Sequence, residues 1–337
     1  MNDSISENLF KRFVPIKGLF DLTYHCNLRC QHCCIVGENR EELALQEVKC
    51  IIDQLFEMKT FMLLFSGGEP LIRSDITDIL SYARKLNFRI ELFTNGTLLD
   101  RNLAREFARI GVNNISVSLY GVSDKVHDEV TGVDGSYEAT VRAIHILREC
   151  GINITVKSSI ISTNFEEADD LYKWSSKAGI FHQFSCVIVP MLNGSKDNIK
   201  SLSEDQVRAF LKKPWVRQHA ASSMVEQQND RICSAGVTSF NISPYGDVFP
   251  CPYLRISCGN TREVNFSESW NSPSMRYIRK ISLDDLDACS KCELAKKWCN
   301  ICIGQAWLEN GTFLEPSSSR CQYSKILNET YIEDAII

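Results

Sequence analysis

Six short strand-like runs alternate with amphipathic stretches over the first 190 residues, and this repeat constrains the fold more than any other feature. The runs lie at 19–23, 61–65, 90–94, 114–119, 153–160 and 182–189. The run Phe61-Met-Leu-Leu-Phe65 is apolar throughout, which is typical of a parallel strand buried on both faces. Several of the stretches between runs end in Asn or Gly, where a helix C-terminus adopts the left-handed conformation: Leu86-Asn87, Ile110-Gly111, Cys150-Gly151 and Ala178-Gly179.

Strand–helix units with short returns indicate an α/β fold. We predict a partial (β/α)6 TIM-like barrel, with a doubly wound sheet as the alternative. The loops after the first four runs are polar or rich in glycine; they hold a cysteine cluster, Ser66-Gly-Gly-Glu-Pro70, Thr94-Asn-Gly96 and Ser116-Val-Ser-Leu-Tyr-Gly121. Barrel enzymes build their active sites at the C-terminal ends of the strands. We therefore predict the active site at this end of the barrel.

The cysteine cluster after the first run holds Cys26, Cys30 and Cys33, with three and then two residues between them. Three thiolates at this spacing can hold three irons of a [4Fe–4S] cube and leave the fourth iron without a protein ligand. Zinc is the alternative, but zinc sites usually show paired C-x2-C halves, and no second half lies nearby. An iron with an open position indicates chemistry rather than storage.

Composition favours a cytoplasmic protein. The chain has 337 residues, and its fifteen cysteines are accompanied by neither a signal peptide pattern nor an apolar run near the roughly 18–20 residues of a membrane span. In a reducing cytosol, clustered cysteines are metal ligands more often than disulfides. The net charge of −5 gives no reason to expect nucleic acid as a partner. Cys50, Cys150 and Cys186 stand alone in apolar runs, and we predict them in the core.

These motifs together resemble the radical S-adenosylmethionine (SAM) enzymes over roughly residues 17–190. The resemblance is carried by Cys26-x3-Cys30-x2-Cys33, Gly67-Gly68-Glu69-Pro70, Thr94-Asn95-Gly96 and Ser118-Leu-Tyr-Gly121. It implies a [4Fe–4S] cluster on the three cysteines, with the amine and carboxylate of SAM on the open iron. It also implies reductive cleavage of SAM to a 5′-deoxyadenosyl radical that abstracts a substrate hydrogen atom. A reductase such as flavodoxin or ferredoxin is the implied electron donor.

The resemblance also implies a set of SAM contacts. Gly67, Gly68 and Glu69 would supply backbone and side-chain contacts to the methionyl amine, and glycine permits close approach of the backbone. Ser118 is carried over as a ribose contact. His32 stands where the family often places an aromatic residue beside the adenine. Close relatives commonly have Tyr in the position after Cys33, but this chain has a further cysteine with no spacing partner. We interpret that residue, Cys34, as a pocket-lining thiol.

A second cysteine system occupies the C-terminal third. Cys289-x2-Cys292 followed by Cys299-x2-Cys302 would alone suit a zinc site. The larger pattern, Cys233-x12-Gly246-x4-Cys251 and then the four-cysteine run and Cys321, resembles the SPASM extension of radical SAM enzymes, which normally carries two auxiliary [4Fe–4S] clusters. Cys299 is displaced by one position from the family spacing. The resemblance implies two ligand sets: Cys289, Cys292, Cys299 and Cys321 for one cluster, and Cys233, Cys251 and Cys302 for the other, with Cys258 as its candidate fourth ligand.

We expect four segments: an N-terminal extension (1–16), the radical SAM barrel (17–190), a linker (191–230) and a SPASM domain (231–337). The favoured function is modification of a ribosomally made peptide or protein, by thioether or carbon–carbon crosslinking or by epimerisation. The alternative is a small-molecule enzyme that remodels tetrapyrrole side chains or dehydrogenates a sugar. A non-catalytic iron–sulfur electron carrier is a third reading, which the Gly67-Gly68-Glu69-Pro70 loop disfavours. A peptide substrate would need a stand-alone recognition protein or direct docking in the barrel.

Overall fold

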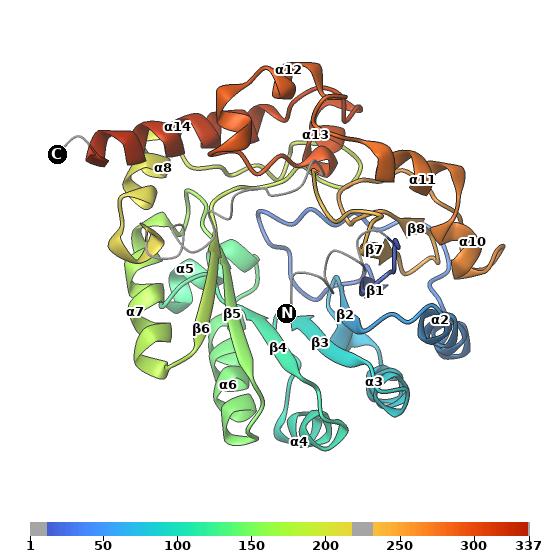
Figure 1. Ribbon diagram of the computed structural model, residues 1–337. Coiled ribbons are helices and arrows are strands. Elements are labelled where there is room, and N and C mark those ends of the chain that lie inside the picture. The colour runs from blue at the N-terminus through green and yellow to red at the C-terminus, as the bar shows by residue number, and fades with distance from the viewer. Residues whose placement is uncertain (1–11, 218–231, 336–337) are drawn as a thin grey trace.

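The computed structural model describes residues 12–217 and 232–335, and its centre is a single curved sheet (Figure 1). The strand order is β6-β5-β4-β3-β2-β1-β7-β8; neighbours are parallel apart from the antiparallel pair β7–β8. The strands are β1 (Lys17–Thr23), β2 (Met62–Gly67), β3 (Arg89–Thr94), β4 (Asn114–Ser118), β5 (Ile154–Ser159), β6 (Phe181–Ser185), β7 (Ser239–Ile242) and β8 (Val248–Phe249). The first six overlap the six runs expected from the sequence, although β6 ends four residues before the sixth run does, and the α/β fold with a partial TIM-type barrel is confirmed.

Helices cover the outer face of the sheet, and most of the chain's C-terminal part is also helical (Figure 1). Those between the barrel strands are α2 (Leu45–Glu57), α3 (Ile76–Lys85), α4 (Arg101–Ile110), α5 (Asp124–Thr131), α6 (Ser136–Glu149) and α7 (Ala168–Ala178), with short 3-10 helices η1 (Pro70–Ile72) and η2 (Phe165–Glu167). The later ones are α8 (Glu204–Leu211), α10 (Phe266–Trp270), α11 (Pro273–Lys280), α12 (Asp287–Ser290), η3 (Glu293–Lys296), α13 (Ile303–Asn310) and α14 (Ser318–Ala335).

Local signals explain where these helices begin and end. The carboxylate of Asp100 accepts a hydrogen bond from the backbone N–H of Leu103 at 2.7 Å and so caps the start of α4. Gly111 ends the same helix with a φ of 82°. Asn87, Gly151 and Gly179 also have positive φ, at 64°, 72° and 65°. The helix stops expected from the sequence are therefore confirmed.

The main core lies between the sheet and its outer helices. Phe20, Phe65, Ile90, Ile115 and Val156 have no exposed surface and belong to one apolar cluster with the inner faces of the helices. Because side chains alternate along a strand, the residues between these point to the concave side of the sheet.

Of the three cysteines expected in the core, Cys186 is buried, and Cys150 is partly buried and packs against the main core cluster. The prediction for Cys50 is wrong, because its side chain is exposed on α2.

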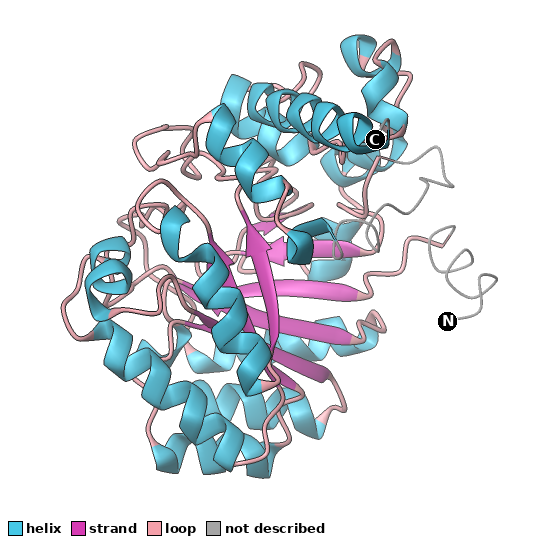
Figure 2. Ribbon diagram, turned by 90° about the vertical axis from the view of Figure 1, so that its left-hand side faces the viewer, coloured by secondary structure: helices cyan, strands magenta, loops and turns pink. Residues whose placement is uncertain are grey.

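The C-terminal region extends the barrel as well as covering it. Strand β7 pairs with β1 in parallel, with Leu19 opposite Asn241, so the sheet continues beyond the six expected strands. Helices α12, α13 and α14 lie across one end of the sheet (Figures 1 and 2). The four segment boundaries stay a prediction, and residues 1–11 and 218–231 lie outside the described part of the chain. Within that part, no helix is long and apolar enough to cross a membrane.

Candidate active site

The loop after β1 brings its three cysteines together. Cys26 and Cys33 both act electrostatically on the Cys30 thiol, and burial is the main reason that its pKa rises to about 12. Backbone hydrogen bonds fasten this loop to the end of α5: the N–H of Arg29 donates to the carbonyl of Thr131 at 2.8 Å, and Gln31 N–H donates to that of Val130 at 2.9 Å. The loop is therefore fixed from its middle as well as from its ends.

The glycine loop after β2 packs directly against the start of the cysteine loop. The N–H of Gly68 donates to the carbonyl of Thr23 at 2.7 Å, and the N–H of Glu69 donates to that of His25 at 2.9 Å. A Cβ on Gly67 would lie 2.1 Å from the Thr23 oxygen, and one on Gly68 would lie 2.2 Å from the His25 oxygen. Both positions need glycine because the two loops touch, a reason that the sequence did not reveal.

Glu69 is buried completely, and its carboxylate holds two strand ends together. Oε1 accepts from the Leu71 N–H at 3.0 Å and from the Thr94 hydroxyl at 2.7 Å, and Oε2 accepts from the Asn95 N–H at 2.7 Å. Burial raises its pKa to about 7 against the effect of these donors. Three of about four acceptor positions are thus used within the protein. The predicted side-chain contact with the methionyl amine stays a prediction.

Ser118 and His32 lie at one cavity, as the predicted ribose and adenine contacts require. Its volume is about 360 Å³, and it opens at the C-terminal ends of β4, β5 and β6. The ring of His32 meets that of Tyr120 edge-on, with centroids 4.6 Å apart. Burial lowers the pKa of His32 to about 4, so its imidazole is neutral near pH 7. The three cysteine thiols of the β1 loop act on the buried hydroxyl of Tyr120, which places the cavity beside them.

Cys34 also lines this cavity, which agrees with its interpretation as a pocket-lining thiol. Burial raises its pKa to about 12. Tyr253, from the C-terminal region, lines the cavity too. Burial raises the pKa of its hydroxyl, and electrostatic interaction with the thiols of Cys34, Cys251 and Cys302 raises it further. Tyr253 thus lies between the cavity and the auxiliary cysteines. Lys157 of β5 is the one lysine or arginine among the cavity-lining residues that the structure describes.

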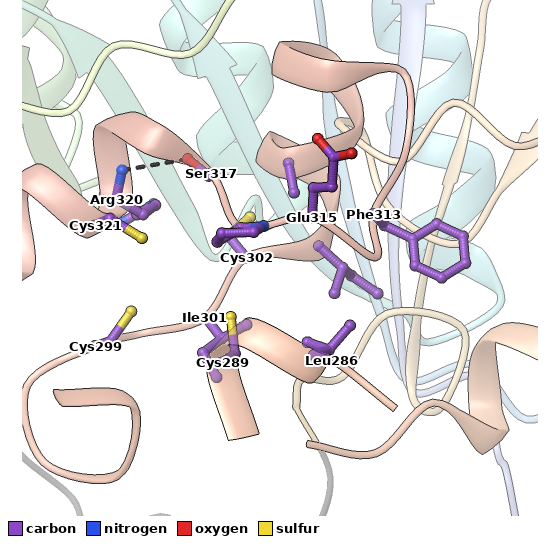
Figure 3. Close-up of a pocket in the computed structure, with 13 residues that line it drawn as sticks. Leu286, Cys289, Cys299, Ile301, Cys302, Phe313, Glu315, Ser317, Arg320 and Cys321 are labelled. Carbon is purple, nitrogen blue, oxygen red and sulfur yellow. Dashed lines mark hydrogen bonds between the residues drawn. The ribbon is translucent and has the colours of Figure 1, made fainter. Parts of the chain in front are cut away.

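Four C-terminal cysteines form a second group. Cys292, Cys299 and Cys321 all act on the thiol of Cys289, whose pKa is raised mainly by burial. Cys289, Cys299 and Cys321 line a small cavity of about 20 Å³, which Cys302 lines too (Figure 3). The structure therefore brings together the four residues expected as one ligand set, including the displaced Cys299.

Three further cysteines form the other group. Cys233 and Cys302 both act on the Cys251 thiol, whose pKa burial raises to about 12. The Leu254 N–H donates to the Cys251 sulfur at 3.2 Å, and the Gln305 N–H donates to the Cys302 sulfur at 3.4 Å.

Cys258 lies elsewhere. Its thiol is 3.6 Å from the carbonyl oxygen of Ile256, and Ser272 and Arg279 are the side chains that act on it. The structure thus does not join the tentative fourth ligand to this group.

The donor chemistry of all three groups fits iron–sulfur clusters, because cysteine sulfur is the usual ligand of their irons. Among the described residues, no three or more His, Cys, Asp or Glu side chains converge closely enough to hold a single metal ion. In a cubane each cysteine binds a different iron, so its ligands stand farther apart than those around one ion. Coordination would also overcome the raised thiol pKa values, because iron binds the thiolate form.

Comparison with known proteins defines the class. Residues 21–175 match the radical SAM superfamily, and residues 233–293 match the SPASM iron–sulfur cluster-binding domain. The chain therefore belongs to the radical SAM enzymes with a C-terminal SPASM domain. Its cofactors are SAM, the [4Fe–4S] cluster of the superfamily and auxiliary iron–sulfur clusters.

Individual relatives come from more than one functional class. The AdoMet-dependent heme synthase of Methanosarcina barkeri is 29% identical over 328 residues, which span 88% of this chain and 93% of that one. The Fe-coproporphyrin III synthase of the same organism is 26% identical, spanning 85% and 82%. The antilisterial bacteriocin subtilosin biosynthesis protein AlbA of Bacillus subtilis is 28% identical, spanning 79% and 61%. Among solved structures, anSMEcpe with bound AdoMet has a TM-score of 0.77 at 18% identity, covering 96% of this chain and 98% of its own.

Tyr120, Lys157 and Tyr253 are among the cavity residues that sequence reasoning missed. Tyr120 lies within the Ser118-Leu-Tyr-Gly121 motif, so its position was visible although its role was not.

His127 and Asp128 have structural contacts next to the cavity. His127 Nδ1 accepts from the Tyr120 N–H at 3.1 Å, and Asp128 accepts from the N–H groups of Gly135 and Tyr137 at the start of α6.

Proposed function

We propose that this radical SAM enzyme abstracts a hydrogen atom from a side chain of a tetrapyrrole. The observation that carries the proposal is the similarity to the heme synthase over 88% of this chain and 93% of the relative, since the match runs through nearly the whole length of both proteins. Fe-coproporphyrin III synthase, a second relative named for an iron tetrapyrrole, matches 82% of its own length. The small-molecule reading therefore takes precedence over peptide modification.

The cavity beside the cysteine loop supports a small-molecule substrate. Its volume of about 360 Å³ lies within the range of ligand pockets, and apolar side chains such as Phe184, Val187 and Ile188 alternate there with polar ones. A flat, largely apolar ring with polar side chains would meet both kinds of surface. Because the cavity is open to solvent on one side, a large ring could extend beyond it.

We assign roles to this chain's residues as part of the proposal. Cys26, Cys30 and Cys33 would hold the cluster that, when present, reduces SAM. Glu69, Gly67 and Gly68 would keep the cysteine loop and the glycine loop in position relative to each other. Ser118 and His32 would orient the adenosyl group. The proposed ligand sets of two auxiliary [4Fe–4S] clusters are Cys289, Cys292, Cys299 and Cys321 for one, and Cys233, Cys251 and Cys302 for the other. Cys258 is left out of the second set, and flavodoxin or ferredoxin is the proposed electron donor.

Peptide modification remains the second candidate, favoured by the similarity to AlbA. That match spans 61% of the relative, so more than a third of the bacteriocin protein has no counterpart in the matched region. If the substrate is a peptide, the cavity would have to take one residue of it while the remainder docks outside. A stand-alone recognition protein would then be the proposed partner.

The test uses anaerobically reconstituted protein with SAM, dithionite and Fe-coproporphyrin III. We expect release of 5′-deoxyadenosine together with a change in the mass of the porphyrin, followed by chromatography and mass spectrometry. Deuterium on the porphyrin side chains should appear in the 5′-deoxyadenosine, because the radical takes its hydrogen atom from the substrate.

Two controls define the outcome. Cys30→Ala should abolish both products, because the three-thiol group loses one member. An unchanged porphyrin mass with continuing 5′-deoxyadenosine release would refute the tetrapyrrole proposal and leave the radical SAM class intact.

A further inference from the structure

Lys157 is the one lysine or arginine among the described residues that line the cavity. Lys157 projects from the middle of β5, opposite Ser118 on β4 and Gln183 on β6. All three residues line the cavity, so they form a row across its floor. Lys157 is the only member of this row that carries a charge.

The Lys157 ammonium lies over an aromatic ring and has no anionic partner in contact. Its Nζ is 3.7 Å from the centre of the Phe93 ring. Among residues 12–217 and 232–335, no hydrogen bond or ion pair engages this ammonium. Burial and, to a smaller extent, the nearby Lys17 lower its pKa to about 8 against the opposing effect of Glu91. The cation therefore sits in a partly desolvated place where a negative ligand group would be favourable.

The SAM carboxylate is an unsuitable partner by position. The methionyl end of SAM is expected at the glycine loop after β2, and the strand order runs β2-β3-β4-β5. At about 4.8 Å between neighbouring strands, β5 lies about 14 Å from β2 along the sheet. The lysine side chain therefore reaches the substrate part of the cavity rather than the methionine part.

We propose that Lys157 binds a carboxylate of the substrate and so selects a tetrapyrrole that carries acidic side chains. The inference rests on the proposed function, which it makes more specific. The ammonium offers three donors and Gln183 beside it can add another, which suits the two oxygens of a carboxylate. Anchoring one side chain in this way would fix which part of the ring faces the adenosyl group. Lys157 is thus proposed as a specificity-determining residue.

The test measures binding of Fe-coproporphyrin III and of its tetramethyl ester by anaerobic absorbance titration, in the presence of SAM. Lys157→Met keeps the bulk over Phe93 and removes the charge. We expect it to weaken binding of the acid by about 10- to 100-fold, the span of one hydrogen bond to a charged group, and to leave ester binding unchanged. Lys157→Arg should restore acid binding to within about threefold. Lys177→Met, which removes an exposed lysine from α7, should behave as the wild type.

Each result decides one point. If Lys157→Met binds acid and ester as the wild type does, or weakens both equally, the carboxylate contact is refuted while the tetrapyrrole function stands. If Lys157→Met instead weakens SAM binding or slows SAM cleavage without substrate, Lys157 belongs to the SAM site and the proposal also fails. If the wild type binds neither porphyrin, the proposed function itself fails.

Discussion

Replacing Gly68 by Ala should uncouple the glycine loop from the cysteine loop. The new Cβ would lie 2.2 Å from the carbonyl oxygen of His25, the residue directly before Cys26. The neighbour is backbone, so no side chain can rotate away. The two loops would have to separate by about 0.8 Å to bring this distance to 3.0 Å. The hydrogen bonds from the Gly68 and Glu69 N–H groups, at 2.7 and 2.9 Å, would lengthen by a similar amount.

The expected effects differ in size. Overpacking of this kind costs about 1–3 kcal/mol in stability, which a protein of this length withstands. A misplacement near 1 Å between reacting groups can cost about 10²-fold in rate. We therefore expect Gly68→Ala to fold and to release 5′-deoxyadenosine about 100-fold more slowly than the wild type.

The assay combines the rate of 5′-deoxyadenosine release with iron content and a thermal unfolding curve. Gly37→Ala is the matched control, since a Cβ at that exposed glycine meets nothing within 4 Å. A Gly68→Ala protein with the wild-type rate would refute the argument that contact between the loops sets the geometry of the site. So would equal losses in the two variants, because the steric difference between them would then be irrelevant.

Further predictions concern the cysteines and a buried histidine. Cys302→Ala should lower the iron content per chain, whereas Cys258→Ala should leave it unchanged, because only the first thiol lies with Cys251; equal iron loss would contradict the grouping. His182 is buried between the hydroxyls of Ser158 and Ser175, and burial lowers its pKa to about 3. Below about pH 6.5, His182 therefore binds a proton in the unfolded chain but stays neutral in the folded chain. The free energy of unfolding accordingly falls as the pH drops. From pH 7.5 to 5.5, His182 should lower the free energy of unfolding by about 1.4 kcal/mol. In urea unfolding, His182→Phe should remove this part of the pH dependence. An unchanged pH dependence would contradict the prediction.

The local features of the fold could be predicted because they have local causes. Apolar runs and left-handed helix ends located six strands and several helix stops. Cysteine spacing indicated the first cysteine group, and the resemblance to the SPASM extension implied the other two. Cys258 was misjudged because spacing alone suggested proximity to Cys251. In the structure its N–H donates to the carbonyl of Val248 at 2.9 Å, and its thiol lies 3.6 Å from the carbonyl oxygen of Ile256.

Other features depend on contacts between distant segments. Lys157 lies in a run that predicted a strand, but its cavity forms only when β4, β5 and β6 are side by side. Strand β7 spans four residues, too few to stand out in the sequence, and its partner β1 is more than 200 residues away. The sequence predicted close backbone approach at Gly67 and Gly68, and attributed it to SAM. In the structure, the backbone that approaches them is that of Thr23 and His25.

The pairing of β7 with β1 has a consequence for how the protein matures. The side-chain amide of Asn241 donates to the carbonyl of Leu19 at 3.2 Å across 222 positions of the chain. During synthesis, β1 therefore has one open edge until the ribosome has released β7, which lies more than two thirds of the way along the chain. A fragment that ends before β7 would expose that edge beside the cysteine loop and would be prone to aggregate. Stable insertion of the first cluster should accordingly be a late event that awaits the C-terminal third.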